Sequence, residues 1–215
     1  MSSTPPKQCL VALDVEGVLT PEIWIALAES LQIDSLKRTT KDEPDYQLLM
    51  NGRLDLLRKH NVGIDEIRQV ISTLSPLDGA KDFLDKLRVH FPVILLSDTF
   101  EDFIGPLMVQ LGNPTILCHK LDITEDGGIL EFVPRVPDQK KRAVLSFREL
   151  NYKVIAAGDS YNDLSMIDAA DLGLLFRAPD NVRLERSDLL ALDAYDDLYN
   201  LIYETANDLL TELDS

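Results

Sequence analysis

Three apolar runs of this sequence end in polar side chains of the types that bind metal ions and phosphate. The runs and the polar residues after them are Cys9–Leu13 with Asp14 and Glu16, Pro92–Leu96 with Ser97 and Thr99, and Val154–Ala157 with Asp159 and, one helical turn later, Asp163. In an open α/β sheet the ligand crevice lies outside the carboxyl ends of the strands. If these runs are parallel strands, we expect their carboxylates and hydroxyls to converge on one site.

Converging carboxylates suit Mg²⁺, a hard cation that takes oxygen ligands from one or two carboxylates, water and a substrate phosphate. We expect Asp14 and Asp159 to be its carboxylate ligands. The ion would offset the repulsion between Asp14 and a phosphate dianion, so that Asp14 could attack phosphorus and form an aspartyl phosphate. Glu16 would protonate the leaving oxygen and later deprotonate the attacking water or alcohol. Ser97 and its neighbouring amides would hold phosphate oxygens.

A cation is also needed near the phosphate oxygens that gain charge in the transition state. The segment PDQKKRAVL offers two candidates, Lys140 and Lys141, just before a predicted helix. We favour Lys140, because apolar residues follow it at +3, +4 and +7 and would bury the helix face below it. Lys141 stays open as the alternative.

The elements that must position these residues alternate between strands and helices, which predicts a doubly wound α/β fold with a mainly parallel sheet. Two further strands are predicted, at Pro114–Cys118 and Leu172–Phe176, and helices at Ala80–Val89, Arg142–Leu150, Asp163–Ala170 and near the carboxyl terminus, where Leu198, Leu201, Ile202, Leu209 and Leu213 recur at helical spacing. Between residues 21 and 75 apolar residues recur at helical spacing without a strand pattern. We therefore predict a catalytic core, residues 1–20 and 76–215, with an inserted helical cap domain, residues 21–75.

The formal net charge of −16 disfavours nucleic acid as a partner. The same charge would repel a phosphorylated metabolite, so its site must supply local cations. Cys9 and Cys118 lie in apolar runs and are expected to be buried thiols. The run CLVALD is too short for a signal peptide and no apolar stretch approaches the length of a membrane span. We expect a cytoplasmic protein with no membrane partner, as a monomer or a homodimer.

The ordered segments DVEGVLT, LLSDT, PDQKKR and GDSYND resemble the four motifs of the haloacid dehalogenase superfamily of phosphatases. The chain is more closely similar to phosphoserine phosphatases, and in particular to the bifunctional phosphoserine phosphatase/homoserine phosphotransferases, whose sequences also read LEGVLVPEIW, ILSDTF and AAGDSYND. The resemblance implies a Rossmann-like core with a helical cap, Mg²⁺ as cofactor, and phosphoserine as substrate. By this resemblance Asp14 would be the nucleophile, and Glu16 would be the acid/base and would bind the metal through its carbonyl. The carboxylate ligands of the metal would be Asp14, Asp159 and Asp163. The residues that bind the phosphate or the rest of the substrate would be Lys140, Ser97, Asp98, Thr99 and Asn162.

The resemblance also places the amino-acid carboxylate of the substrate against Arg53, whose guanidinium fits a carboxylate bidentately. We expect Glu22 to attract the substrate ammonium, although ordinary phosphoserine phosphatases have the corresponding glutamate one position later, where this chain has Ile23. Most phosphatases of the superfamily have aspartate where this chain has Glu16, whereas the homoserine branch has the same glutamate. The extra methylene leaves the acceptor open between water and homoserine.

Alternative interpretations stay open for several of these residues. The chain could instead act on a nucleotide or sugar phosphate, or bind without turnover. Arg53 could pair with Asp55 or Glu66 on the surface, and Asp163 could only begin a helix. The three histidines lack metal-ligand spacing and are expected to be structural or on the surface, and Trp24 is expected to contribute to packing.

Overall fold

The computed structural model describes residues 8–39, 43 and 45–211. In chain order the elements are β1 (Gln8–Leu13), α1 (Ile23–Leu31), the 3-10 helix η1 (Asp34–Lys37), α2 (Tyr46–Lys59), α3 (Ile64–Ser72), α4 (Ala80–His90), β2 (Val93–Phe100), α5 (Glu101–Gln110), β3 (Ile116–Ile123), β4 (Ile129–Val133), α6 (Gln139–Glu149), β5 (Tyr152–Gly158), the 3-10 helix η2 (Tyr161–Asp163), α7 (Leu164–Ala169), β6 (Leu172–Phe176), α8 (Asp180–Glu185), β7 (Leu190–Leu192) and α9 (Tyr195–Thr211).

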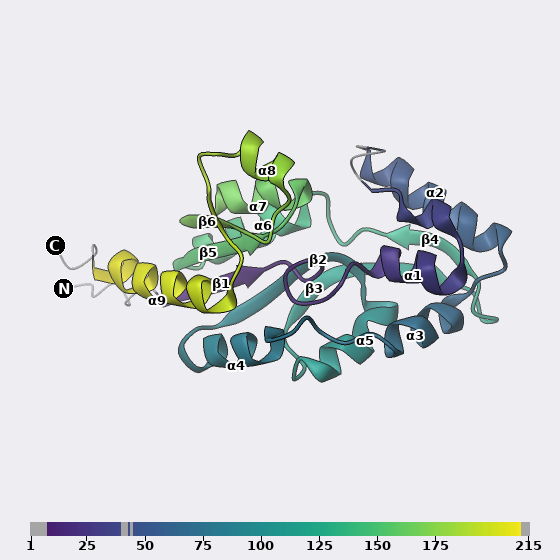
Figure 1. Ribbon diagram of the computed structural model, residues 1–215, viewed down its shortest axis with the longest axis horizontal. Helices are drawn as coiled ribbons and strands as arrows, with labels where there is room; N and C mark the ends of the chain where they lie inside the picture. Colours follow the sequence, from purple (N-terminus) through teal and green to yellow (C-terminus); the bar gives the residue numbers. More distant parts are fainter. Residues whose placement is uncertain (1–7, 40–42, 44, 212–215) are drawn as a thin grey trace.

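A seven-stranded sheet forms the centre of the molecule, with strand order β4-β3-β2-β1-β5-β6-β7. Every neighbouring pair is parallel except β3 and β4, which are antiparallel. Helices cover both faces, with α6 and α7 on one side and α4, α5 and α9 on the other (Figure 1). The prediction of a doubly wound, mainly parallel sheet is confirmed.

β1 lies near the middle of the sheet and is covered on both faces, which explains its continuous apolar run. Val11 and Leu13 pack in the hydrophobic cluster that contains residues of α4, α5 and α9, whereas Leu10 and Ala12 pack with residues of α6 and α7. The central strand is therefore held by packing on both of its faces, and its carboxyl end positions the residue that follows it.

The predicted elements match those of the structure with small shifts. β2 continues to Phe100 rather than ending at Leu96, so Ser97, Asp98 and Thr99 lie within its last residues, where its pairing register with β3 shifts. The strand predicted at Pro114–Cys118 begins two residues later and continues to Ile123. β4 and β7, both at sheet edges, were not among the predicted strands.

The chain between β1 and α4 is helical in its described residues, with α1, η1, α2 and α3 and no strand element. Of the apolar positions that recur there at helical spacing, Leu31 is partly buried and the others are buried, namely Ile23, Leu27, Leu54, Leu57, Ile64, Ile67 and Ile71. α3 packs on α5 and α2 packs on β4, so these helices adjoin the strand ends on one side of the sheet (Figure 1).

α9 confirms the predicted terminal helix, with Leu198 and Ile202 buried, while Leu213 lies outside the described residues. Cys9 and Cys118 are buried free thiols, as expected. In the part of the chain that the structure describes, no helix has both the length and the apolar character needed to cross a membrane.

Candidate active site

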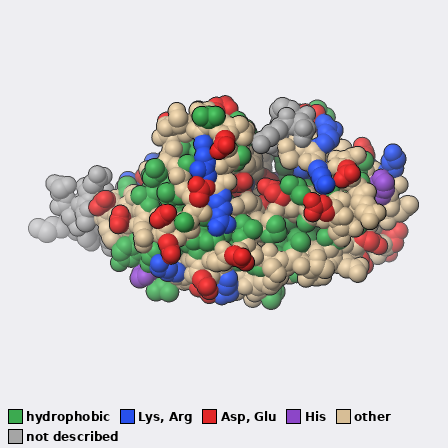
Figure 2. All heavy atoms as spheres, viewed as in Figure 1, with side chains coloured by type: hydrophobic (Ala, Val, Ile, Leu, Met, Phe, Trp, Pro, Cys, Tyr) green, Lys and Arg blue, Asp and Glu red, His purple; other side chains and the backbone are tan. Residues whose placement is uncertain are grey.

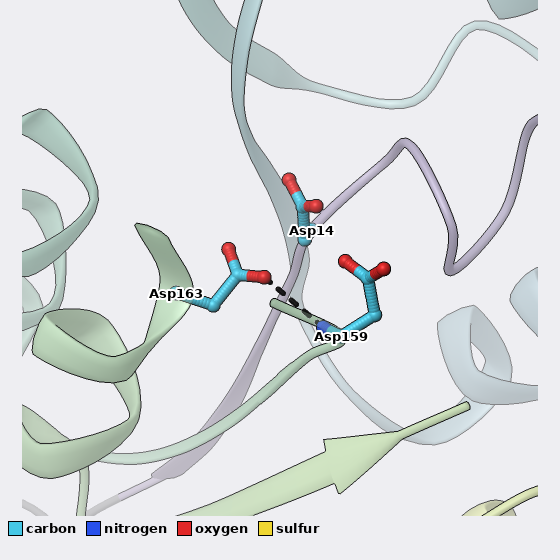
Figure 3. A group of neighbouring side chains, drawn as sticks. All are labelled: Asp14, Asp159 and Asp163. Atoms are coloured by element: carbon cyan, nitrogen blue, oxygen red, sulfur yellow. Dashed lines mark hydrogen bonds between the residues drawn. The ribbon is translucent and has the colours of Figure 1, made fainter. Parts of the chain in front are cut away.

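Three carboxylates meet where the strands β1 and β5 end side by side. Asp14 directly follows β1, and its amide donates to the carbonyl of Ala157 in β5 at 3.0 Å. Asp159 follows β5, and Asp163 is the last residue of η2. Each of the three aspartates offers a carboxylate oxygen within 4.8 Å of the other two, and the side chains point toward one another (Figure 3). The convergence expected from the strand ends is therefore present.

Backbone amides hold the Asp163 carboxylate in place. Its Oδ2 accepts from the amides of Asp159 at 3.0 Å and Ser160 at 3.1 Å, which leaves Oδ1 facing the site. Gly158 permits this turn, because a Cβ there would lie 2.6 Å from Oδ2 of Asp163. Asp163 is also the residue from which α7 begins, as its alternative interpretation expects.

Among the described residues, Lys140 supplies the one buried ammonium of this cluster. Its Nζ lies 2.7 Å from Oδ1 of Asp163, 2.9 Å from Oδ1 of Asp14 and 3.1 Å from Oδ2 of Asp98. Lys140 is 3 % exposed. Lys141, the alternative, is exposed on the first turn of α6.

Negative charge exceeds positive charge in this cluster. Burial, and then the neighbouring carboxylate of Asp163, raise the pKa of Asp14 well above its usual value. The same two causes raise the pKa of Asp159 to about 8. Burial would lower the pKa of Lys140, but the surrounding carboxylates outweigh it and hold that pKa well above its usual value. A divalent cation fits this site, because hard oxygen donors converge there with uncompensated charge.

Glu16 lies on the loop that joins β1 to α1. Its Oε2 accepts the amide of Ile23 at 2.9 Å. Burial, followed by the nearby Glu22, raises the pKa of Glu16 to about 7. A carboxyl group with this pKa can both donate and accept a proton near neutral pH, which an acid/base residue requires.

Gly17 lets this loop lie close to the carboxylate of Asp159. It has a φ of +75°, and a Cβ at this position would lie 2.6 Å from Cγ of Asp159. Any other residue would therefore combine a strained backbone with displacement of Asp159.

Asp98 connects four separate parts of the chain. Its Oδ2 accepts from Asn162 at 2.8 Å and from Lys140, its Oδ1 lies 3.4 Å from Nε2 of His119, and its carbonyl accepts the hydroxyl of Tyr46 at 2.9 Å. Burial alone would raise the pKa of Asp98, but Lys140 and the bonds from His119 and Asn162 hold it below its usual range.

Arg53 of α2 is buried in the wall formed by the helical segment. Its guanidinium lies over the Trp24 ring, 4.6 Å from the ring centroid, and its Nη2 donates to the carbonyl of Arg38 at 2.7 Å. Its Nε has no hydrogen-bond partner among the described residues. The two acids of the alternative interpretation have other partners: Asp55 pairs with Arg58, and the carboxylate of Glu66 accepts the amide of Gly63.

A pocket of about 220 Å³ joins the carboxylate cluster to Arg53. Figure 2 shows this face hollowed between α8 and α2, with acidic side chains visible in the hollow. The predicted site residues that line the pocket are Asp14, Glu16, Glu22, Arg53, Ser97, Asp98, Lys140, Asp159 and Asn162. Thr99 and Asp163 are fully buried behind its wall.

Three residues of this region, Trp24, Tyr46 and His119, are absent from the predicted site residues. Trp24 and Tyr46 line the pocket, and His119 borders a second pocket of about 590 Å³ beside it. Trp24 lies two residues after Glu22, a position that could have marked it as more than packing. Tyr46 and His119 lie far from Asp98 in the sequence or on other elements, and they contact it only in the folded chain.

The fold, the aspartate after β1, and the buried lysine define a class of phosphate-handling α/β hydrolases. Residues 10–171 match the haloacid dehalogenase-like hydrolases, and the chain belongs to this family. It is 51% identical over 189 residues to the phosphoserine phosphatase ThrH of Pseudomonas aeruginosa, which covers 88% of this chain and 92% of the relative. It is 49% identical over 198 residues to a phosphoserine phosphatase of Pseudomonas syringae pv. tomato, covering 92% and 84%.

Solved structures agree on the fold. A crystal structure of a phosphoserine phosphatase in its apo form superposes with a TM-score of 0.71 at 18% identity, covering 87% of this chain and 94% of that one. A phospho-aspartyl intermediate analogue of a phosphoserine phosphatase superposes with a TM-score of 0.70, also at 18% identity, covering 87% and 93%.

Proposed function

We propose that this protein is a Mg²⁺-dependent phosphoserine phosphatase in which Asp14 carries the phosphoryl group as an aspartyl phosphate. The observation that carries the proposal is the position of Asp14 between the buried ammonium of Lys140 and the carboxylates of Asp159 and Asp163, at one end of a pocket whose wall holds Arg53. The similarity to two phosphoserine phosphatases near 50% identity supports the choice of substrate.

The residues present fit a magnesium ion. Asp14, Asp159 and Asp163 would hold it through carboxylate oxygens, and the family resemblance adds the carbonyl of Glu16. When bound, Mg²⁺ would neutralise part of the carboxylate charge and withdraw charge from a phosphate oxygen. Burial, and then the neighbouring carboxylate of Asp163, raise the pKa values of Asp14 and Asp159, so a cation bound between these groups would favour their charged forms.

The chain's own residues would then perform two half-reactions. In the first, an oxygen of Asp14 forms a bond to phosphorus while the bond from phosphorus to the serine oxygen breaks, and Glu16 gives its proton to that oxygen. In the second, Glu16 removes a proton from the acceptor, whose oxygen attacks phosphorus and releases Asp14. Lys140 and Ser97 would bind the phosphoryl oxygens, and Asn162 would line the entry to them.

The other end of the pocket suits an amino-acid substrate. We propose that Arg53 binds the carboxylate and that Glu22 attracts the ammonium. The buried Nε of Arg53 without a partner supports this role, since a carboxylate in the pocket would supply an acceptor. We also propose residues 21–75 as the cap domain that encloses the substrate.

The acceptor in the second half-reaction is an oxygen nucleophile. The pocket that binds the serine part of the substrate would also bind a similar hydroxy amino acid. We propose homoserine as a second acceptor beside water, because the homoserine branch also has glutamate at the position of Glu16. We further propose a cytoplasmic location and a monomer or homodimer.

The direct test incubates the protein with Mg²⁺ and phosphoserine, with and without homoserine, and measures serine, free phosphate and phosphohomoserine. We expect phosphate in both reactions and phosphohomoserine only with homoserine. Absence of both products would refute the proposal. In a companion assay, Arg53→Ala should raise KM for phosphoserine at least tenfold and leave KM for p-nitrophenyl phosphate nearly unchanged. An unchanged KM for phosphoserine would favour a nucleotide or sugar phosphate as substrate.

A further inference from the structure

His119 lies on β3 behind the phosphate end of the site and is 4 % exposed. Its Nδ1 accepts the backbone N–H of Arg135 at 3.2 Å. In the neutral ring the proton must therefore lie on Nε2, which faces Oδ1 of Asp98 at 3.4 Å. The ring thus has one nitrogen fixed by the backbone and the other directed at a carboxylate of the site.

Aromatic neighbours fix the plane of this imidazole. The rings of Phe100 and Tyr46 lie with their centroids 6.2 and 6.4 Å from it. Tyr46 also donates its hydroxyl to the carbonyl of Asp98. These contacts restrain His119 and Asp98 together.

The second oxygen of Asp98 faces the catalytic groups. It lies 3.1 Å from Nζ of Lys140 and 2.8 Å from Nδ2 of Asn162. A connected path therefore runs from the Arg135 amide through His119 and Asp98 to the ammonium that touches Asp14.

We propose that His119 is a positioning residue for phosphoryl transfer, which acts through Asp98 to hold Lys140 and Asn162 at the phosphate site. The proposal rests on the proposed function. It also assigns Asp98 to the support of Lys140, because Oδ2 of Asp98 contacts Lys140 and Asn162 while its Oδ1 faces His119.

The physical reason lies in the change at Asp14 during the reaction. As a carboxylate, Asp14 attracts the Lys140 ammonium, but as an acyl phosphate it has lost that charge on its own oxygens. Asp98 does not react, so a rigidly held Asp98 keeps Nζ in place through both half-reactions. Support of this kind typically changes activity by about 10- to 100-fold when it is removed.

Two substitutions separate this role from a merely structural one. In His119→Asn the short amide can still accept the Arg135 N–H but does not reach Asp98. In His119→Gln the longer amide can place its NH₂ near the former Nε2 and donate to Asp98, while the contact with Arg135 is lost. Both variants lose the aromatic ring, so packing loss is common to the pair, and their difference reports the contact with Asp98.

We expect His119→Asn to lower kcat for phosphoserine and for p-nitrophenyl phosphate by about 10- to 100-fold, with KM within about threefold of wild type. His119→Gln should recover kcat to within about fivefold. The matched control is His90→Phe, an exposed histidine on α4, which should leave kcat unchanged. A smaller loss in His119→Asn than in His119→Gln would show a structural role for His119 and overturn the proposal.

A double-mutant cycle tests the path. If His119 acts through Asp98, then in the Asp98→Asn background His119→Asn should change kcat by less than about twofold. Independent, multiplying effects would overturn the proposal, as would wild-type kcat in His119→Asn. Wild-type protein that turns over neither substrate would instead refute the proposed function, so the two failures are distinguishable. Thermal unfolding of each variant shows whether a loss of activity is due to unfolding. If His119→Asn is unfolded, His119→Gln replaces it in the cycle.

Discussion

The ammonium nitrogen of Lys140 lies 2.9 Å from Oδ1 of Asp14, although 126 residues separate the two in the chain. The contact is buried, with 3 % and 5 % of the two side chains exposed. Two further carboxylates, from Asp163 and Asp98, share the same ammonium. One lysine therefore stabilises an acidic site that the fold assembles from three separate strand ends.

The first prediction concerns the two adjacent lysines. Lys140→Met leaves three carboxylates without their cation, so we expect the free energy of unfolding to fall by about 3–5 kcal/mol and kcat to fall by about 100-fold or more. Lys141→Met, the matched neighbour, should change stability by less than about 0.5 kcal/mol and retain activity. Denaturant unfolding and phosphatase assays check both. Inactivation by the Lys141 substitution alone would identify Lys141 as the phosphate-binding lysine.

The second prediction concerns Gly17. Gly17→Ala adds a Cβ where the Asp159 carboxylate now lies and forces a left-handed backbone on alanine. We expect a loss of about 1–2 kcal/mol in the free energy of unfolding. The Mg²⁺ concentration that gives half-maximal activity should rise about tenfold or more.

The control for this substitution is Gly52→Ala in α2, where nothing lies within 4 Å of an added Cβ. It should stabilise the protein by about 0.4–1 kcal/mol. If Gly17→Ala and Gly52→Ala need the same Mg²⁺ concentration for half-maximal activity, the absence of a side chain at Gly17 is not required to position Asp159.

The third prediction concerns the Trp24 ring beneath Arg53. A cation–π contact contributes about 0.5–2 kcal/mol, so Trp24→Leu should raise KM for phosphoserine by about 2- to 30-fold. Trp24→Phe keeps an aromatic face and should give a smaller increase. KM for p-nitrophenyl phosphate should stay constant, because that substrate has no amino-acid carboxylate. An equal rise in KM for both substrates would show general damage to the pocket instead.

The fourth prediction concerns metal removal and pH. In the metal-free protein the pKa of Asp159 is about 8, raised from 3.8. Between these values the folded state binds a proton that the unfolded state does not, so the free energy of unfolding should fall as pH rises through this window. Mg²⁺ should relieve the repulsion, so the increase in Tm on adding Mg²⁺ should grow from about pH 5 to about pH 8.

Asp159→Asn supplies the control for this measurement. Without metal its Tm should depend less on pH than that of wild type, and Mg²⁺ should raise its Tm less. A wild-type Tm that rises with pH in the presence of a chelator would contradict the assigned electrostatics.

Much of this arrangement follows from the sequence, because apolar runs that end in polar residues place Asp14, Ser97 and Asp159 at neighbouring strand ends whatever the details of packing. The choice of Lys140 over Lys141 also followed from helical periodicity, which determines the face that is buried. The edge strands β4 and β7 were less predictable, since residues exposed on one side break the apolar run.

The contacts around Asp98 could not be predicted in the same way. His119 and Tyr46 come from β3 and α2, and their positions depend on how β3 pairs with β2 and where the helical segment packs. Single histidines carry no spacing signal, and the sequence therefore favoured a structural role for His119. The role of Trp24 is similar, because its contact with Arg53 joins two different helices.

The proposed function depends on Asp14 as the residue that carries the phosphoryl group. The most direct measurement mixes the protein with Mg²⁺ and radiolabelled phosphoserine, quenches the reaction in acid within one turnover, and locates the label by mass spectrometry of the digested chain. Glu16→Gln should increase the labelled fraction, because it slows attack on the acyl phosphate more than its formation when the leaving group is good. We expect label on Asp14 and none in Asp14→Asn; label on another residue, or turnover by Asp14→Asn at the wild-type rate, would refute the role of Asp14.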